Sequence, residues 1–187
     1  MDSLTERESS LTPTARLLGY AGLLPQIICV GLVASGSEYR FTALFMGFVY
    51  PAIIFSFLGG VWWGQSLARP GHAGAFVNVL AVLPSLIAAA LFMPYQYGWE
   101  WPGPALFYLG ALLALSPMID RALGFAAKDF LQLRWHLSLG LGGLSIALGV
   151  LGTQAMAIPN HSTVVPADHA PQSGSEVVLK EAPRHGG

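Results

Sequence analysis

The chain has 187 residues, enough for one domain, and 53% of them are hydrophobic whereas only 10% are charged. A soluble domain carries about 25% charged residues, so this composition excludes an ordinary water-exposed surface. The formal net charge of −1 excludes a basic surface for nucleic acid. The apolar residues form long uninterrupted blocks, and lipid is the solvent that such blocks require.

Five apolar runs predict the fold. They lie at about residues 15–33, 41–68, 73–93, 105–119 and 130–151. A membrane core is about 30 Å thick, which takes about 20 helical residues to cross. The predicted fold is therefore an all-α integral membrane bundle of about five transmembrane helices. The fourth run is short, so a re-entrant segment is the alternative for it.

The chain divides into one folded unit and two tails. Residues 1–14 are predicted to be a flexible segment, residues 15–152 the transmembrane domain, and residues 153–187 a disordered tail rich in Pro, Ser, His and Gly. The mixed, slightly acidic start disfavours a cleaved signal peptide.

Prolines mark the expected helix start and bends. Thr12 can cap a helix that begins with Pro13. Pro51 lies inside the long second run and predicts a bend there. Pro25, Pro51 and Pro84 each leave a backbone carbonyl without its usual donor, so polar side chains or water are expected to satisfy these carbonyls.

The basic residues predict an orientation. For five spans the N-terminal side holds Arg7, Arg16, Arg69, Arg121, Lys128 and Arg134, and the opposite side holds Arg40, with Lys180 and Arg184 far out in the tail. The positive-inside rule then places the N-terminus in the cytoplasm and the tail in the periplasm of a bacterial inner membrane.

Small residues and tryptophans are the first candidate functional groups. Gly59, Gly60 and Gly64 would let another helix approach closely, either inside the bundle, which is the favoured interpretation, or at a dimer or partner face. The aromatic residues expected to anchor the chain at the membrane interface are Trp62, Trp63, Trp99 and Trp101. A stacking platform for a lipid-like ring is the alternative for the pair in the second run.

Polar residues inside the runs are the second group. Candidate buried polar or charged residues are Asn78, Gln65, Arg134, His136 and Asp120. Because Arg134 lies near a helix start, the favoured interpretation is that it extends to the headgroups. The alternative is an internal pair with Asp120 or Asp129 that clamps the last two helices. Other polar groups that can bond between helices are Gln26, Ser56, Ser85 and Ser116.

Three stretches resemble one family. Residues 18–25 (LGYAGLLP) look like its opening helix, residues 56–64 (SFLGGVWWG) like its most recognisable stretch, and residues 82–86 (VLPSL) like its third helix. The family is the domain-of-unknown-function 3429 group, which is similar to transmembrane protein 69 of mitochondria. The resemblance implies an uncharacterised bacterial membrane protein and carries over no catalytic residue.

Three function classes fit this sequence. The first is a small scaffold or assembly helper that acts through contacts with other membrane proteins or with itself. The second is a small-molecule or ion transporter or channel component, which usually has polar groups near the midplane. The third, an intramembrane enzyme, is disfavoured because no catalytic or metal motif is visible. The expected partners are the lipid bilayer and other membrane proteins, with no cofactor and no nucleic acid.

Overall fold

The computed structural model describes residues 12–68, 75–97, 103–124 and 128–157, and over these residues the chain consists of helices and the turns beside them. Five helical segments are long and apolar enough to cross a membrane. The all-α fold with five spans is therefore confirmed. The predicted flexible N-terminal residues up to 11 and the tail from 158 onward lie outside the described residues.

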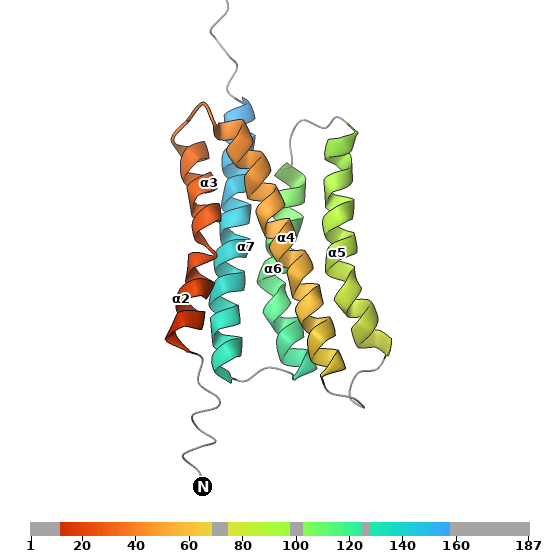
Figure 1. Cartoon of the computed structure of the whole chain (residues 1–187). Helices are drawn as coiled ribbons and strands as arrows, with labels where there is room; N and C mark the ends of the chain where they lie inside the picture. The colour runs from red at the N-terminus through yellow and green to blue at the C-terminus, as the bar shows by residue number, and fades with distance from the viewer. Residues whose placement is uncertain (1–11, 69–74, 98–102, 125–127, 158–187) are drawn as a thin grey trace, which may run out of the picture.

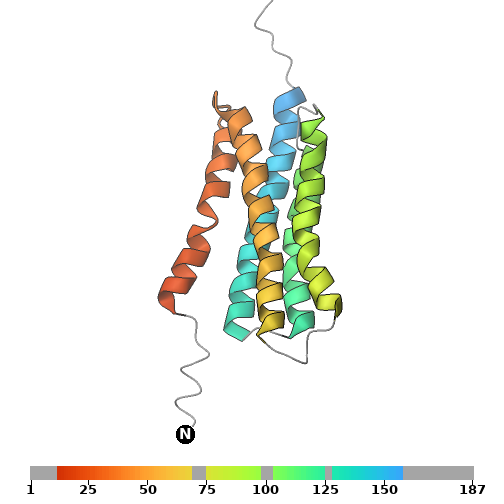
Figure 2. The same cartoon turned by 45° about the vertical axis from the view of Figure 1, so that its right-hand side comes forward.

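The first span is made of two helices. The first, α2 (Pro13–Ala21), begins as predicted, because Thr12 Oγ accepts a hydrogen bond from the Ala15 backbone N–H. The second, α3 (Leu24–Ala34), carries Pro25 in its first turn, where proline is tolerated but the preceding helix cannot continue unbroken. None of the α2 side chains is buried, whereas α3 buries Gln26, Cys29 and Val33. Figure 2 shows α2 diverging from the other helices toward its N-terminal end.

The other four spans alternate in direction (Figure 1). They are α4 (Arg40–Leu67), α5 (Ala75–Gln96), α6 (Gly103–Leu123) and α7 (Lys128–Ala157). The start of α2 and the end of α7 lie at opposite ends of the bundle, and we call the end where α2 begins the N-terminal end. At 21 residues α6 is one helix long and apolar enough to span, which favours a full span over the re-entrant alternative. The last helix also continues past the predicted domain boundary at 152.

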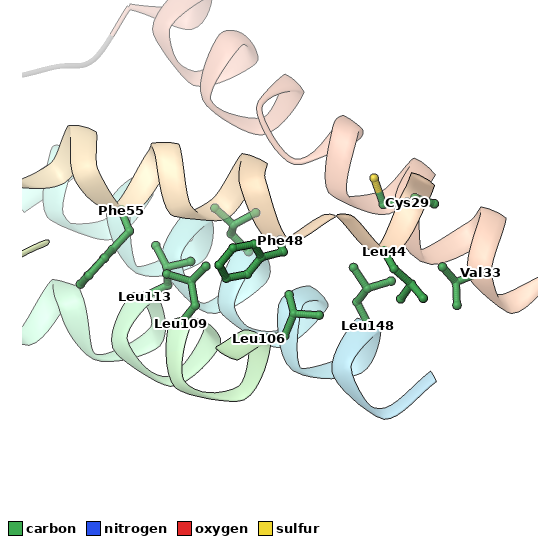
Figure 3. Packing of buried hydrophobic residues seen from close by; sticks show 11 residues of the cluster. Cys29, Val33, Leu44, Phe48, Phe55, Leu106, Leu109, Leu113 and Leu148 are labelled. Carbon is green, nitrogen blue, oxygen red and sulfur yellow. The ribbon is translucent and has the colours of Figure 1, made fainter. Parts of the chain in front are cut away.

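The core lies between α3, α4, α6 and α7. Leu106, Leu109 and Leu113 recur at helical spacing on α6 and are at most 1% exposed. They pack with Phe48 of α4 and Leu148 of α7 in one cluster, which Figure 3 shows from close by. Because lipid is as apolar as leucine, this packing gains mainly dispersion energy and shape fit.

Two helix pairs approach so closely that only glycine fits. A Cβ atom at Gly110 of α6 would lie 2.7 Å from Gly142 O of α7, and one at Gly142 would lie 2.6 Å from Gly110 O. A Cβ atom at Gly59 of α4 would overlap the backbone carbonyl oxygen of Ala81 on α5. These contacts fix the α6–α7 and α4–α5 distances.

Candidate functional site

Three side chains from three helices meet at a buried carboxylate near the N-terminal end of the bundle. Asp120 of α6 is 4% exposed. Trp62 Nε1 of α4 donates a hydrogen bond to Asp120 Oδ1 over 2.6 Å, and Arg134 Nε of α7 donates one to Oδ2 over 2.9 Å. We call Trp62, Asp120 and Arg134 the Asp120 cluster. Its charge-assisted hydrogen bonds are stronger than neutral ones and join three spans.

Arg134 is held as one half of a buried ion pair. Its Nη2 atom lies 2.8 Å from Asp120 Oδ2 without the angle of a second hydrogen bond, and its side chain is 11% exposed. The Phe130 ring centroid lies 5.9 Å from the guanidinium carbon. Arg134 therefore pairs with Asp120 inside the bundle, as in the alternative interpretation, and the favoured interpretation, in which it extends outward unpaired, is wrong. A charged side chain inside a membrane protein is usually stabilised by a partner of opposite charge.

Hydroxyl groups continue this polar region one turn deeper. Ser116 Oγ donates to Leu113 O over 2.8 Å and lies 3.2 Å from Ser138 Oγ. Leu113 O has lost its helical donor because Pro117 lacks an N–H. Ser116 therefore satisfies the carbonyl that the proline leaves free.

A second polar cluster lies between α3, α4 and α7. Gln26 is fully buried, and its Nε2 donates to Gly47 O over 3.0 Å and to Ser145 Oγ over 3.3 Å. Gly47 O is the carbonyl that Pro51 leaves without a donor. We call Gln26, Gly47 and Ser145 the Gln26 cluster. The prediction that a polar side chain satisfies this carbonyl is confirmed.

The remaining polar candidates lie closer to the surface than predicted. Asn78 is exposed, although its Oδ1 accepts a hydrogen bond from Ser66 Oγ of α4 over 3.3 Å, and Gln65 is half-buried. His136 is exposed, with Nδ1 3.2 Å from Tyr20 Oη of α2. The prediction that Asn78 and His136 are buried is wrong, because both residues are exposed.

Two of the four candidate tryptophans lie in the described residues, and they behave differently. Trp63 is 52% exposed, which fits an interface anchor. Trp62 is 1% exposed and donates to Asp120, so its predicted role as an anchor is wrong. The buried carboxylate gives the indole N–H a charge-assisted hydrogen bond inside the bundle. Trp99 and Trp101 lie outside the described residues, so their role as anchors stays a prediction.

The three candidate glycines also differ in their surroundings. Gly59 packs against α5, as favoured. Gly60 and Gly64 are exposed, and a Cβ atom at either position would have no heavy atom within 4 Å. Packing inside the bundle is therefore wrong for these two, and their role at a partner face stays a prediction.

Several functional neighbours were not predicted from the sequence. Ser138 and Ser145 look like ordinary residues of an apolar run, and no local signal identifies their partners. The adjacent Ser116 and Pro117 do carry a signal, because a serine beside a proline can satisfy the freed carbonyl. Among the residues that the structure describes, no group of three His, Cys, Asp or Glu side chains gathers in a metal-binding arrangement.

These features define a multi-pass membrane protein whose polar side chains bond to one another inside a five-span helical bundle. The chain belongs to the family described as "Protein of unknown function (DUF3429)", whose model matches residues 11–151. The predicted family is thus confirmed. No curated protein matches the chain, and no solved structure matches it either.

Proposed function

We propose that this chain is a small scaffold or assembly helper that works through helix–helix contacts in the membrane and not by catalysis. The observation that supports this most is the outer face of α4. There Phe57 and Trp63 are 65% and 52% exposed, Leu67 is 67% exposed, and Gly60 and Gly64 lie among them with open space at their Cβ positions. Small residues beside large apolar ones let a second helix approach and gain dispersion contacts.

The inward polar groups support the same proposal. In the Asp120 cluster and the Gln26 cluster, Trp62 Nε1, Arg134 Nε and Gln26 Nε2 donate to acceptors of the protein itself. A solute pathway would instead require polar groups that line it. In this proposal the interior polar groups maintain the helix positions, and the outer face of α4 meets the partner.

We also propose the bacterial inner membrane as the location, with the N-terminus in the cytoplasm and the C-terminal tail in the periplasm. Arg16, Arg121 and Arg134 lie toward the N-terminal end of the bundle, and Arg40 lies at the other end. This asymmetry follows the positive-inside rule. A reporter enzyme that is active only in the periplasm, fused after residue 187, should be active, whereas the same fusion before residue 1 should be inactive.

Native mass spectrometry of the full chain, extracted in a mild lipid-preserving detergent, tests the function. The parent should carry a stoichiometric second protein. Gly60→Leu should lose that protein while keeping the parent's melting temperature, because the leucine fills only outside space. Gly31→Leu is the matched control, since Gly31 of α3 is also exposed with nothing within 4 Å of its Cβ position.

Either of two results would overturn the proposal. A lone chain that carries a small molecule would favour transport. Equal loss of the partner in Gly60→Leu and Gly31→Leu would show that the face of α4 has no special role.

A further inference from the structure

A groove of about 560 Å³ opens between the first span, α4 and α7. Its apolar walls come from Leu18 and Leu23 of the first span, Ile54 and Leu58 of α4, and Leu137 and Leu141 of α7. The groove exists because α2 buries no side chain and diverges from the bundle below the break at Gly22 (Figure 2). Tyr50 of α4 donates a hydrogen bond to Gly22 O and so holds the break in place.

The inner wall of this groove is polar at one end. Arg134 and Ser138 line it one helical turn apart. Asp120 engages the Nε and Nη2 atoms of Arg134, on one edge of the guanidinium. The two N–H groups of Nη1 lie outside that contact, and guanidinium donors match phosphate oxygens well.

The position of Arg134 along α7 indicates which kind of ligand can place a phosphate oxygen beside it. Arg134 is the seventh residue of α7, so it lies about 9 Å from the helix start. With 30 residues α7 is about 45 Å long and exceeds a hydrocarbon core of about 30 Å, so about 7 Å at each end extends among the headgroups and Arg134 lies near their boundary with the acyl chains. From there the groove continues toward Leu141 and Tyr50, deeper in the bundle. An acceptor at the boundary with a hydrocarbon chain extending inward is the shape of a phospholipid.

A second groove on the other side of α4 provides a contrast. It has a volume of about 440 Å³ and lies between α4 and α5, where Phe45, Ile53 and Phe92 line it and Ser56 is the polar lining residue. It holds no cation. Both grooves can hold an acyl chain, but of the two only the groove with Arg134 offers guanidinium N–H groups that can bond to a phosphate.

We propose that the groove between α2, α4 and α7 binds one anionic glycerophospholipid, with an acyl chain along its apolar walls and its phosphate at Arg134. This site borders the outer face of α4 at Phe57, which lines the groove, but Gly60 and Gly64 are not among its lining residues. A bound lipid would replace the contacts that α2 lacks with the bundle.

The test uses the purified full chain, delipidated by detergent exchange and titrated with phosphatidylglycerol or with diacylglycerol of the same acyl chains. Native mass spectrometry should show one phosphatidylglycerol bound per chain, with a preference over diacylglycerol of at least about fivefold, the value of one arginine beside an anionic headgroup. Equal binding of the two lipids would overturn the proposal.

Two substitutions locate the site. Ile54→Trp should fill the groove and lower phosphatidylglycerol occupancy at least fivefold, whereas Ala89→Trp, which fills the other groove, should leave it unchanged. Unchanged occupancy in Ile54→Trp, or a protein chain bound there in place of lipid, would contradict the proposal.

A charge-free variant keeps the test decisive if Ile54→Trp folds poorly. The triple variant Trp62→Phe/Asp120→Leu/Arg134→Met removes the charges of the Asp120 cluster together and leaves the apolar walls in place. It should bind the two lipids equally. If the variant still preferred phosphatidylglycerol, the headgroup would bind away from Arg134, and this result would overturn the proposal.

Discussion

The Asp120 cluster and the Gln26 cluster each join three spans, but through different polar groups. Both join α4 and α7 to a third span through buried polar side chains. The first is an ion pair and lies close to the helix ends, since Asp120 is three residues from the end of α6. The second is neutral and lies near the middle of the first span (Pro13–Ala34), where Gln26 donates to a backbone carbonyl.

The difference indicates that the depth in the membrane decides which kind of polar group can be buried there. A charge near the interface costs less than one at the midplane, and its strong hydrogen bonds can hold three helices. Deeper in the membrane a neutral amide is cheaper to bury, and a proline supplies the unpaired carbonyl that makes the amide useful. The two clusters therefore differ in what their loss should cost.

The largest effect should come from breaking the ion pair. Asp120→Leu or Arg134→Met leaves the opposite charge buried without a partner, and we expect a loss of about 3–5 kcal/mol in the free energy of unfolding. The measurement is unfolding in mixed micelles with increasing dodecyl sulfate, followed by far-ultraviolet circular dichroism.

The double variant Asp120→Leu/Arg134→Met sharpens this result. It should recover most of the loss, because two apolar side chains need no counter-charge. Adding Trp62→Phe should recover the rest, since the indole N–H would otherwise lack its acceptor. Additive losses in the double variant would contradict a coupled pair.

An intermediate effect should come from Trp62→Phe in the parent chain. It removes one hydrogen bond to a charged group, and we expect a loss of about 1.5–3 kcal/mol. Trp63→Phe is the matched control, because Trp63 is half exposed and should change stability by less than about 0.5 kcal/mol. Equal effects of the two substitutions, by the same unfolding measurement, would show that the bond from Trp62 to Asp120 contributes nothing.

The smallest effect should come from the neutral cluster. Gln26→Met leaves Gly47 O without a donor and should cost about 1–2 kcal/mol. In a Pro51→Ala chain the restored N–H of residue 51 can bond to Gly47 O, so the same substitution should cost less than about 1 kcal/mol. A cost that is the same in both chains would mean that the amide does not compensate for the proline.

The sequence predicted the five spans because their apolar runs are set by membrane thickness and need no knowledge of contacts. The helix start at Thr12 and Pro13 was predicted for a similar reason, since capping is local. The pairing of Pro51 with a polar side chain was also predictable in kind, although the sequence did not identify Gln26 as the partner.

Side-chain direction was the part that the sequence could not give. Trp62 and Trp63 are adjacent, yet one faces the Asp120 carboxylate and the other is half exposed. Gly59 and Gly60 differ in the same way. In a helix that is apolar on all sides, the periodicity that usually marks the buried face is missing, so only the packed bundle decides which residue of each pair is buried.

The most direct test of the central claim is photocrosslinking in living cells from the outer face of α4. A photoreactive amino acid at Gly64 should crosslink one protein at a constant ratio, and the additional substitution Gly60→Leu should abolish that product. The same amino acid at Gly143, which is exposed on α7 with nothing within 4 Å of its Cβ position, should not form it. A product that forms equally from both positions, or that survives Gly60→Leu, would contradict a partner site on α4.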